Sequence, residues 1–284
     1  MTQTLKIVRT QKALRAQVSE WRLAGKTIAF VPTMGALHSG HMSLVKLAHK
    51  KADRIVASIF VNPTQFAPGE DFESYPRTEK DDVAQLRKEG CDLVYIPRKG
   101  SMYNAHHATH IKVGGVAEGL ETDHRPSFFE GVALVVTKLL NRVAPDVAIF
   151  GEKDYQQLAT IRRLVEDLDM PIDIVGAKIA RDKQGLALSS RNKYFDKDGL
   201  EVARQLNTIM RACAKALKNG ADIETETRKC SDDLLAAGFS AIDYVSVADA
   251  RSLEVLKTGK ISRKGRLLIA AHCRGVRLID NCAI

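Results

Sequence analysis

Thr27 to His41 reads TIAFVPTMGALHSGH, and this stretch sets the class of fold for the rest of the chain. Ile28 to Val31 is apolar and partly β-branched, which predicts a buried strand. Residues 32–35, PTMG, are typical of a turn, so we expect the strand to stop there. Apolar residues recur at helical spacing from about residue 39 to residue 52. The stretch therefore predicts a strand, a tight loop and a helix.

Such a junction forms an anion site when the strand belongs to a parallel sheet. Free backbone N–H groups and the positive end of the helix dipole meet at the carboxyl end of the strand. His38 and His41 lie three residues apart in the first turn, so both imidazoles could face one anion, most naturally a nucleotide phosphate. Two histidines near a helix start also suit an ordinary polar surface, and their spacing leaves both interpretations open.

A longer string around these histidines resembles a known family. His-x-Gly-His after a first strand is similar to the signature of the nucleotidyltransferase superfamily, and residues 32–41, PTMGALHSGH, resemble the pantothenate synthetases within it. Several further strings match the same family in the same order along essentially the whole chain: Asn62-Pro63-Thr64-Gln65-Phe66, Gly151-Glu152-Lys153-Asp154, Ser189-Ser190-Arg191-Asn192 and Leu278-Ile279-Asp280-Asn281.

The composition is that of an ordinary globular protein. The 284 residues are 45% hydrophobic and 27% charged, which suits one large domain or two smaller ones. The sequence lacks an apolar run of about 18 residues, and residues 1–17 lack the apolar core of a signal peptide. Five scattered cysteines without a Cys-x-x-Cys pair indicate neither a disulfide framework nor a zinc site. We therefore expect a cytoplasmic protein that does not bind membranes.

The formal net charge of +9 raises nucleic-acid binding as an alternative. The 43 Lys and Arg residues are spread among 34 acidic residues without a long basic block. This distribution favours small anionic substrates or a basic surface, and we expect no nucleic-acid partner.

The order of the predicted elements indicates an α/β fold. Strands and helices alternate from Thr27 onward, which predicts a right-handed parallel sheet with helices on both faces. Composition then shifts at Gly176. We expect a Rossmann-like nucleotide- and pantoate-binding domain in residues 1–176 and a smaller α+β C-terminal lid domain in residues 177–284.

Amide side chains follow the second predicted strand, Ile55 to Val61. This strand should end beside the first one, which brings Asn62 and Gln65 to the same edge of the sheet. An amide both donates and accepts, so it suits a hydroxyl or a carboxylate. The alternative is an Asx-type turn before Pro63.

Cationic and hydroxyl groups follow later strands. Lys153 lies where a cation can neutralise charge on a reacting phosphate, although a solvated surface lysine is the alternative. Ser189, Ser190 and Arg191 offer two hydroxyls and a guanidinium to a polyphosphate, or form a plain turn.

Acidic residues begin the helix that follows Thr78. Thr78 with Asp81 predicts a capping box. Asp81, Asp82 and Gln85 could hold Mg²⁺ through water, but acidic residues in a first turn usually complement the helix dipole. The metal ligands therefore stay unassigned.

The resemblance implies a homodimeric ligase that uses ATP and Mg²⁺ to adenylate pantoate and then passes the pantoyl group to β-alanine. Closure of the lid domain would shield the adenylate from water. The implied catalytic residues are His38, His41 and Lys153, and the implied contacts to pantoate or β-alanine are Gln65, Gln157 and Asn62. The implied ATP contacts are Met34, Gly35, Ala36, Leu37, His38, Ser39, Gly40, His41, Gly151, Glu152, Lys153, Asp154, Ala180, Leu188, Ser189, Ser190 and Arg191.

The chain departs from the family pattern at four positions. Ser127 and Phe128 replace the Gly and His of Arg-Pro-Gly-His-Phe, and we still expect Arg125 to contact a phosphate or carboxylate. Gln184 and Leu188 replace a common Asp and Met, and we expect neither change to disable the loop. Two other functions stay open: a nucleotidyltransferase that releases a nucleotidylated product, and an RNA-binding module.

Overall fold

The computed structural model describes residues 5–284; residues 1–4, part of the stretch assessed for a signal peptide, lie outside it. The chain forms two compact units. Unit 1 comprises the chain up to Gly114, Arg125–Glu152 and Thr160–Lys178. Unit 2 comprises Gly115–His124, Lys153–Ala159 and Ile179–Ile284. The division into domains of residues 1–176 and 177–284 stays a prediction.

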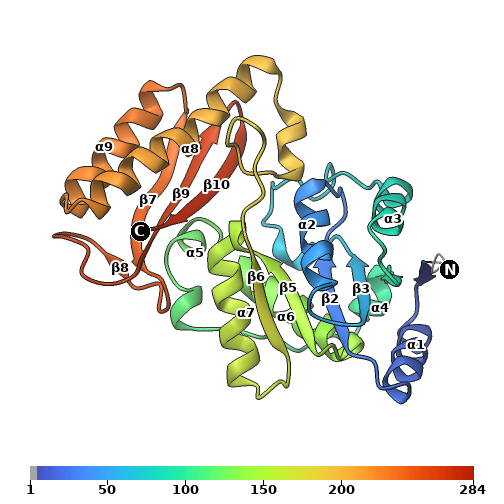
Figure 1. Cartoon of the computed structure of the whole chain (residues 1–284). Coiled ribbons are helices and arrows are strands. Elements are labelled where there is room, and N and C mark those ends of the chain that lie inside the picture. The colour runs from blue at the N-terminus through green and yellow to red at the C-terminus, as the bar shows by residue number, and fades with distance from the viewer. Residues whose placement is uncertain (1–4) are drawn as a thin grey trace. The chain divides into compact units, whose positions relative to one another are not determined.

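Unit 1 contains a six-stranded parallel sheet in the order β1-β4-β3-β2-β5-β6 (Figure 1). The second predicted strand pairs with the first, as expected. The strands are β1 (Lys6–Val8), β2 (Ile28–Thr33), β3 (Arg54–Ile59), β4 (Leu93–Tyr95), β5 (Val147–Gly151) and β6 (Asp173–Ala177).

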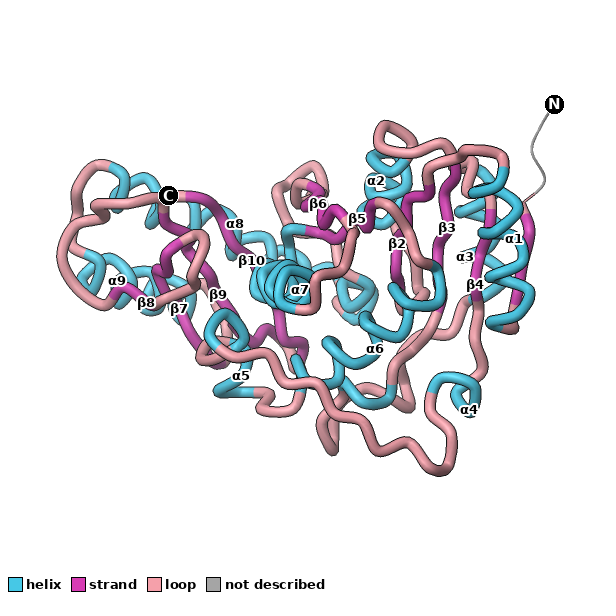
Figure 2. The backbone as a smooth tube through the Cα atoms, turned by 90° about the horizontal axis from the view of Figure 1, so that it is seen from below, coloured by secondary structure: helices cyan, strands magenta, loops and turns pink. Residues whose placement is uncertain are grey.

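Helices cover both faces of this sheet (Figure 2). α2 packs on β2, β5 and α3, whereas α6 packs on β2 and α1. Ala29 and Val31 share a core cluster with Met42 and Val45 of α2, and Phe30 faces the other way because strand side chains alternate. The helices are α1 (Gln11–Leu23), α2 (Ser39–Ala48), α3 (Glu79–Lys88), α4 (Lys99–Met102), α6 (Phe128–Val143) and α7 (Tyr155–Asp167), whose first turn belongs to unit 2.

β2 runs two residues further than the sequence predicts, because Pro32 and Thr33 still pair with β3. The Thr33 hydroxyl donates to the Ser58 carbonyl at 2.7 Å. β5 pairs with β2 only at Ala29 and Phe30, so Pro32 lies beyond that pairing. Proline has no N–H to donate, but at this position no hydrogen bond to β5 is lost. The chain leaves β2 for β3 on one side and returns to β5 on the other. Open parallel sheets bind ligands at such switch points.

Unit 2 contains a four-stranded antiparallel sheet in the order β10-β9-β7-β8. Its core includes Leu206 and Met210 of α8 and Ile269 of β9. The predicted fold class, a parallel α/β part with a smaller α+β part, is confirmed. The elements are α5 (Glu121–His124), α8 (Lys197–Lys218), α9 (Ile223–Ala236), β7 (Ala241–Asp249), β8 (Val255–Leu256), β9 (Gly265–Cys273) and β10 (Val276–Ala283). Among residues 5–284, each helix is too short or too polar to cross a bilayer.

Candidate active site

His38 and His41 cap the helix that follows β2. His38 has extended backbone angles, and its Nδ1 accepts the Gly40 N–H at 3.2 Å. His41 Nδ1 accepts the His38 N–H at 3.3 Å in return. Together they form a reciprocal capping box built from two imidazoles, whose ring centres lie 4.1 Å apart.

These bonds assign the tautomer of both rings. An imidazole nitrogen that accepts a hydrogen bond carries no proton, so each neutral ring bears its hydrogen on Nε2. Protonating either Nδ1 would sacrifice a capping bond. The loop therefore presents two adjacent Nε2–H donors beside the amino end of a helix, which suits a phosphate oxygen.

The loop before His38 rests on the first turn of α3. Asp82 is 1% exposed, and its carboxylate accepts the backbone N–H groups of Ala36 and Leu37. The Thr78 hydroxyl donates to the same carboxylate and makes no capping bond. The predicted Thr78–Asp81 capping box is therefore wrong, because Asp82 attracts the hydroxyl that the cap would use.

Gln65 lies at the buried end of the short 3₁₀ helix Pro63–Gln65 after β3. Its Nε2 lies 3.0 Å from the sulfur of Met34, and its Oε1 accepts Asn62 Nδ2 at 3.1 Å. Asn62 Nδ2 also donates to the Gly131 carbonyl, while the Tyr103 hydroxyl donates to Asn62 Oδ1. Both atoms of the Asn62 amide are thus engaged inside unit 1, where they orient Gln65.

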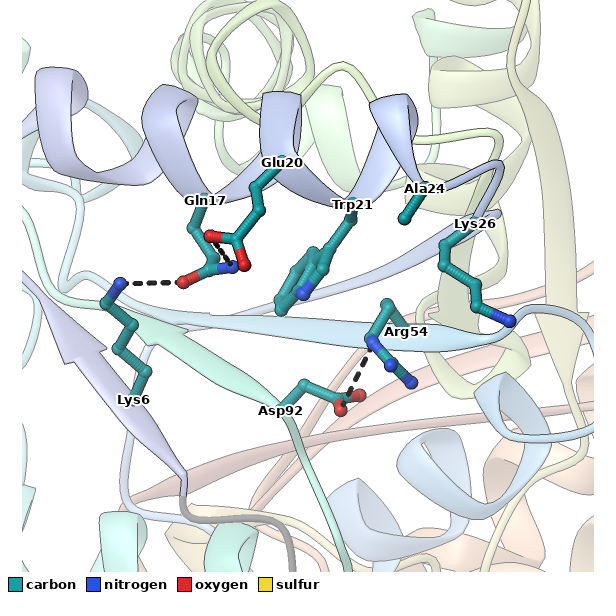
Figure 3. A pocket seen from close by; sticks show the side chains of 8 residues that line it. All are labelled: Lys6, Gln17, Glu20, Trp21, Ala24, Lys26, Arg54 and Asp92. Atoms are coloured by element: carbon teal, nitrogen blue, oxygen red, sulfur yellow. Dashed lines mark hydrogen bonds and ion pairs between the residues drawn. The ribbon is translucent and has the colours of Figure 1, made fainter.

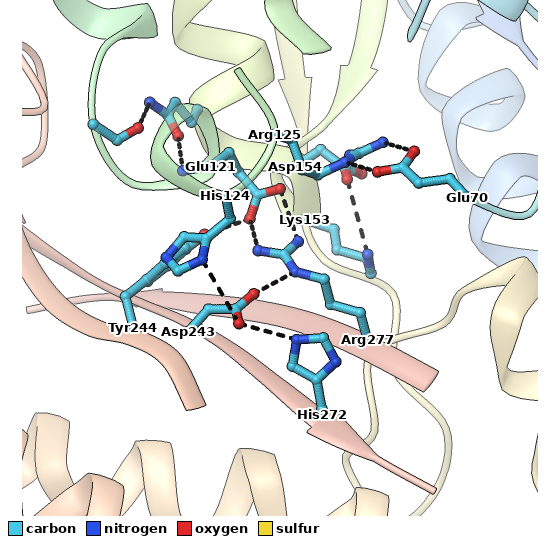
Figure 4. A network of polar contacts seen from close by, with 12 residues as sticks. Glu70, Glu121, His124, Arg125, Lys153, Asp154, Asp243, Tyr244, His272 and Arg277 are labelled. Carbon is cyan, nitrogen blue, oxygen red and sulfur yellow. Dashed lines mark hydrogen bonds and ion pairs between the residues drawn. The ribbon is translucent and has the colours of Figure 1, made fainter. Parts of the chain in front are cut away.

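Arg125 forms a bidentate pair with Glu70, at 2.6 and 2.7 Å (Figure 4). Its guanidinium also donates to the Gln65 carbonyl and lies 3.9 Å from the ring centre of Phe128. Phe128 stands where the family pattern has histidine, and here it stacks on that guanidinium. A contact between Arg125 and a substrate stays a prediction.

Lys153 lies in a 3₁₀ turn, Glu152–Asp154, between β5 and α7. Its ammonium is 3.9 Å from Asp154 Oδ1, and its side chain is 19% exposed. The Lys153 carbonyl accepts Asn281 Nδ2 at 2.8 Å. Asn281 belongs to the Leu-Ile-Asp-Asn string and is buried. Its bond to the Lys153 carbonyl therefore fixes the backbone from which the lysine side chain projects.

The second predicted ATP loop is a compact hairpin. The Leu188 N–H donates to the Ala180 carbonyl, and Arg181 pairs with Ala187. Arg181 forms a bidentate pair with the buried Asp280, at 2.6 and 2.8 Å. Ser189 then caps the 3₁₀ helix Ser190–Tyr194 by accepting the Arg191 N–H.

A polar network that the sequence did not suggest secures residues 115–124 within unit 2 (Figure 4). Arg277 donates to both oxygens of the buried Glu121, at 2.9 and 2.8 Å, and to Asp243 at 2.6 Å. The Gln156 side chain accepts the Glu121 N–H and donates to three carbonyls of residues 116–119. Gln156 directly precedes Gln157, so this network fixes the first turn of α7.

Asp243 gives this network a pH dependence. Burial acts to raise the pKa of its carboxyl, but the hydrogen bond and charge of Arg277, together with His272, lower that pKa below its ordinary value. His124 lies 3.8 Å away on the other side. A carboxyl group whose pKa is lowered on folding stabilises the folded protein at pH values above its pKa in the unfolded chain, about 3.9. This stabilisation is lost as pH falls through its pKa in the folded protein.

We therefore expect Asp243→Asn to lower the urea midpoint clearly at pH 5.5, and the gap to wild type to shrink below about pH 4. The window starts at pH 5.5 so that ordinary histidines are already largely protonated. Urea unfolding followed from pH 5.5 to pH 3 measures the gap. Asp232→Asn, at an exposed acid in the interior of α9, is the control and should give a small gap that stays constant. A constant large gap for Asp243→Asn would contradict the assignment.

A cavity of about 370 Å³ lies elsewhere in unit 1 (Figure 3). Arg54 begins β3 and Asp92 directly precedes β4, so the cavity lies at the amino ends of the strands. The loop of His38 follows the carboxyl end of β2, at the opposite edge. None of the residues predicted to bind ATP or pantoate contributes to the lining, which consists of Lys6, Gln17, Glu20, Trp21, Ala24, Lys26, Arg54 and Asp92.

The predicted site residues divide between the two units. Unit 1 contributes Met34 to His41, Asn62, Gln65, Gly151 and Glu152. Unit 2 contributes Lys153, Asp154, Gln157, Ala180 and Leu188 to Arg191. Their individual roles stay predictions. The sequence names Asp82 only as a possible water-mediated ligand of Mg²⁺, whereas in the structure it is buried and accepts two N–H groups of the loop before His38.

Comparison with known proteins identifies the family. The sequence model of the pantoate-beta-alanine ligase family matches residues 6–283. A pantothenate synthetase of Mesorhizobium japonicum is 52% identical over 275 residues, covering 97% of this chain and 96% of that protein. A pantothenate synthetase of Maricaulis maris is 50% identical, covering 100% of this chain and 98% of that protein.

Solved structures agree with the sequence relatives. The crystal structure of a pantothenate synthetase from Thermus thermophilus has a TM-score of 0.90 at 38% identity, with 98% of each chain covered. A pantoate-beta-alanine ligase from Francisella tularensis, complexed with beta-gamma ATP and beta-alanine, has a TM-score of 0.83 at 31% identity, covering 98% of this chain and 97% of that one. The chain therefore belongs to the pantoate–β-alanine ligase family.

Proposed function

We propose that His38, His41 and Lys153 carry the adenylation step of this ATP-dependent ligase. The protein condenses (R)-pantoate with β-alanine to give pantothenate, AMP and pyrophosphate through a pantoyl adenylate. A carboxylate is a poor acyl donor until one of its oxygens becomes part of a good leaving group. The observation that carries the proposal is the reciprocal capping of His38 and His41, which places two Nε2–H donors on one rigid turn.

In the first step, a carboxylate oxygen of pantoate attacks the α-phosphorus of ATP. The new bond joins that oxygen to phosphorus, and the bond to the β-phosphate oxygen breaks as pyrophosphate leaves. Charge grows on the phosphate oxygens during this exchange. Neutral N–H donors from His38 and His41 and the ammonium of Lys153 stabilise that charge without transferring a proton.

Gln65 and Gln157 hold pantoate for in-line attack. Gln65 suits this role because Asn62 fixes its Oε1 and thereby the plane of its amide. Asn62 enters the proposal as the residue that orients Gln65. Gln157 follows Gln156, whose bonds to residues 116–121 fix that turn of α7.

In the second step, the amine of β-alanine attacks the acyl carbon of the adenylate. The acyl C–O bond breaks, AMP leaves with the electron pair, and the nitrogen loses a proton. No side chain needs to form a covalent intermediate. Ser189, Ser190 and Arg191 enter the proposal as further contacts to the phosphates of ATP.

Mg²⁺ is the proposed cofactor, supplied with ATP. Among residues 5–284, no group of three or more His, Cys, Asp or Glu side chains is placed to hold a metal ion. Mg²⁺ commonly keeps several waters and binds through substrate phosphates, so a nucleotide-borne ion fits this protein. When bound, the ion would neutralise part of the triphosphate charge.

We also propose that the protein acts as a homodimer in the cytoplasm, with small-molecule substrates alone as partners. The proposal follows the family resemblance and the absence of an extended basic block in the sequence. Light scattering after size-exclusion chromatography at micromolar concentration tests the dimer. A mass near the 31.3 kDa of a single chain would contradict it.

Pyrophosphate release tests the activity. We expect release from ATP and Mg²⁺ to require pantoate, to stop near one equivalent without β-alanine, and to become catalytic with AMP formation when β-alanine is added. A reaction without pantoate is the control. If release from folded protein did not depend on pantoate, the proposal would fail, and CTP with other acceptors would be tested next.

A further inference from the structure

The loop that carries His38 has a backbone that needs support. Gly35 has φ +88° and Ala36 has φ +50°, so two successive residues adopt left-handed angles. An L-residue such as Ala36 adopts these angles at a cost in free energy, because its Cβ comes close to the following carbonyl oxygen. Ala36 and Leu37 are nevertheless buried, so the loop packs in a defined position against the rest of unit 1.

The Asp82 carboxylate holds the loop in that position. Its Oδ2 accepts the Ala36 N–H at 3.0 Å, and its Oδ1 accepts the Leu37 N–H at 2.8 Å. A Cβ added at Gly35 would lie 3.0 Å from Asp82 Oδ2, so the loop lies directly against the carboxylate. Gln85, one turn further along α3, donates to the Leu37 carbonyl at 3.3 Å. α3 thus contacts both polar backbone groups of Leu37.

Neutral groups donate the hydrogen bonds that the Asp82 carboxylate accepts. Its hydrogen-bond partners within residues 5–284 are two backbone N–H groups and the Thr78 hydroxyl, and no Lys, Arg or His there forms an ion pair with it. A buried carboxylate persists only where hydrogen bonds compensate its desolvation. Bonds from N–H groups to an ionised acceptor are also stronger than neutral ones. The carboxylate is therefore matched to two successive N–H groups of this loop.

We propose that Asp82 is a positioning residue for adenylation, acting through the two histidines. By fixing Ala36 and Leu37, it sets the direction in which the chain enters α2. That direction places both imidazoles, because His38 is the first capping residue and His41 is bonded to it. The inference rests on the proposed roles of His38 and His41.

Asp82→Asn is the sharpest test because it preserves shape and removes one acceptor. The new NH₂ would face a backbone N–H, so one loop bond is lost. We expect the single-turnover rate of pantoate-dependent pyrophosphate release to fall about tenfold, as for one lost hydrogen bond. The KM values for ATP and pantoate should change by less than about threefold, because the affected groups act in the transition state.

Asp92→Asn is the matched control. Asp92 is also a buried acid that accepts a backbone N–H, from Ile55 at 2.7 Å, but at the amino ends of the strands. Its replacement should change the thermal midpoint while the rate per folded molecule stays within about twofold. An equal fall in rate for both variants would overturn the proposal, since it would indicate general destabilisation.

A double-mutant cycle with His41→Ala tests whether Asp82 acts through the histidines. In the His41→Ala background, Asp82→Asn should cost less than about threefold, because the group that it positions is gone. Independent, multiplicative losses would overturn the proposal. Recovery of the Asp82→Asn rate at high Mg²⁺ would also overturn it, in favour of a metal role. Wild-type release that did not depend on pantoate would instead defeat the proposed function.

Gln85→Met provides a second variant if Asp82→Asn does not fold. It breaks only the bond to the Leu37 carbonyl and keeps the length of the side chain. The same cycle with His41→Ala applies, with a smaller expected loss of about threefold. A wild-type rate for this variant would overturn the proposal.

Discussion

Replacing His41 by alanine is expected to lower the single-turnover rate of pantoyl adenylate formation by at least about a hundredfold. The substitution removes an Nε2–H donor and also the acceptor that holds the His38 N–H. Both proposed donors are therefore affected by one change. Rapid-quench measurement of pyrophosphate release, with ATP and pantoate at saturation, gives the rate.

Two further variants separate catalysis from helix capping. His38→Asn retains a good N-cap residue, so it should keep the thermal midpoint while losing most of the rate. His49→Ala changes an exposed histidine at the other end of α2, where Nε2 contacts the Glu89 carbonyl. It should leave the rate within about twofold. A near-wild-type rate for His41→Ala, or an equal loss in His49→Ala, would contradict the assigned roles.

Gly131→Ala is expected to destabilise the protein by about 3 kcal/mol. A Cβ at this position of α6 would overlap the Thr64 carbonyl and lie 2.8 Å from the Gln65 nitrogen. Both obstacles are backbone, so neither can rotate away. α6 must therefore move off the turn that carries Gln65, which also breaks the bond from Asn62 to the Gly131 carbonyl.

Urea unfolding measures this loss, and Gly100→Ala is its control. Gly100 lies in the short helix α4, and a Cβ there meets no atom within 4 Å. That change should be neutral or slightly stabilising, because alanine is the better helix former. If Gly131→Ala unfolded at the same urea concentration as Gly100→Ala, the close packing of α6 against the backbone of Thr64 and Gln65 would be disproved.

Much of the fold follows from local pattern. The apolar runs after Thr27 and Arg54 predict buried parallel strands, and the structure pairs them as β2 and β3. The local pattern ends β2 too early, at Pro32, since proline is typical of a turn when its neighbours in space are unknown. The strand continues because Thr33 finds partners on β3, a contact that the local sequence does not encode.

The site was predictable only in part, for a related reason. His38 and His41 stand out because they occur in a turn with an unusual string of residues. Asp82 does not, because an acidic residue in a first helical turn looks the same whether it faces water or a buried loop. Glu121 and Arg277 are equally inconspicuous, since each resembles a surface charge until the tertiary fold brings them together.

The pairing of Glu121 with Arg277 spans 156 residues, and this separation has a consequence for protein synthesis. A ribosome that adds about 5–20 residues per second makes Arg277 roughly 8 to 30 seconds after Glu121. During that interval the Glu121 carboxylate in the nascent segment 115–124 cannot accept hydrogen bonds from Arg277, which has not yet been synthesised. The parallel sheet of unit 1 can be complete by residue 177. Gln156 can hold residues 116–121 once α7 has formed, but full resistance of segment 115–124 to proteases should arise only when β10 emerges from the ribosome, well after that sheet has formed.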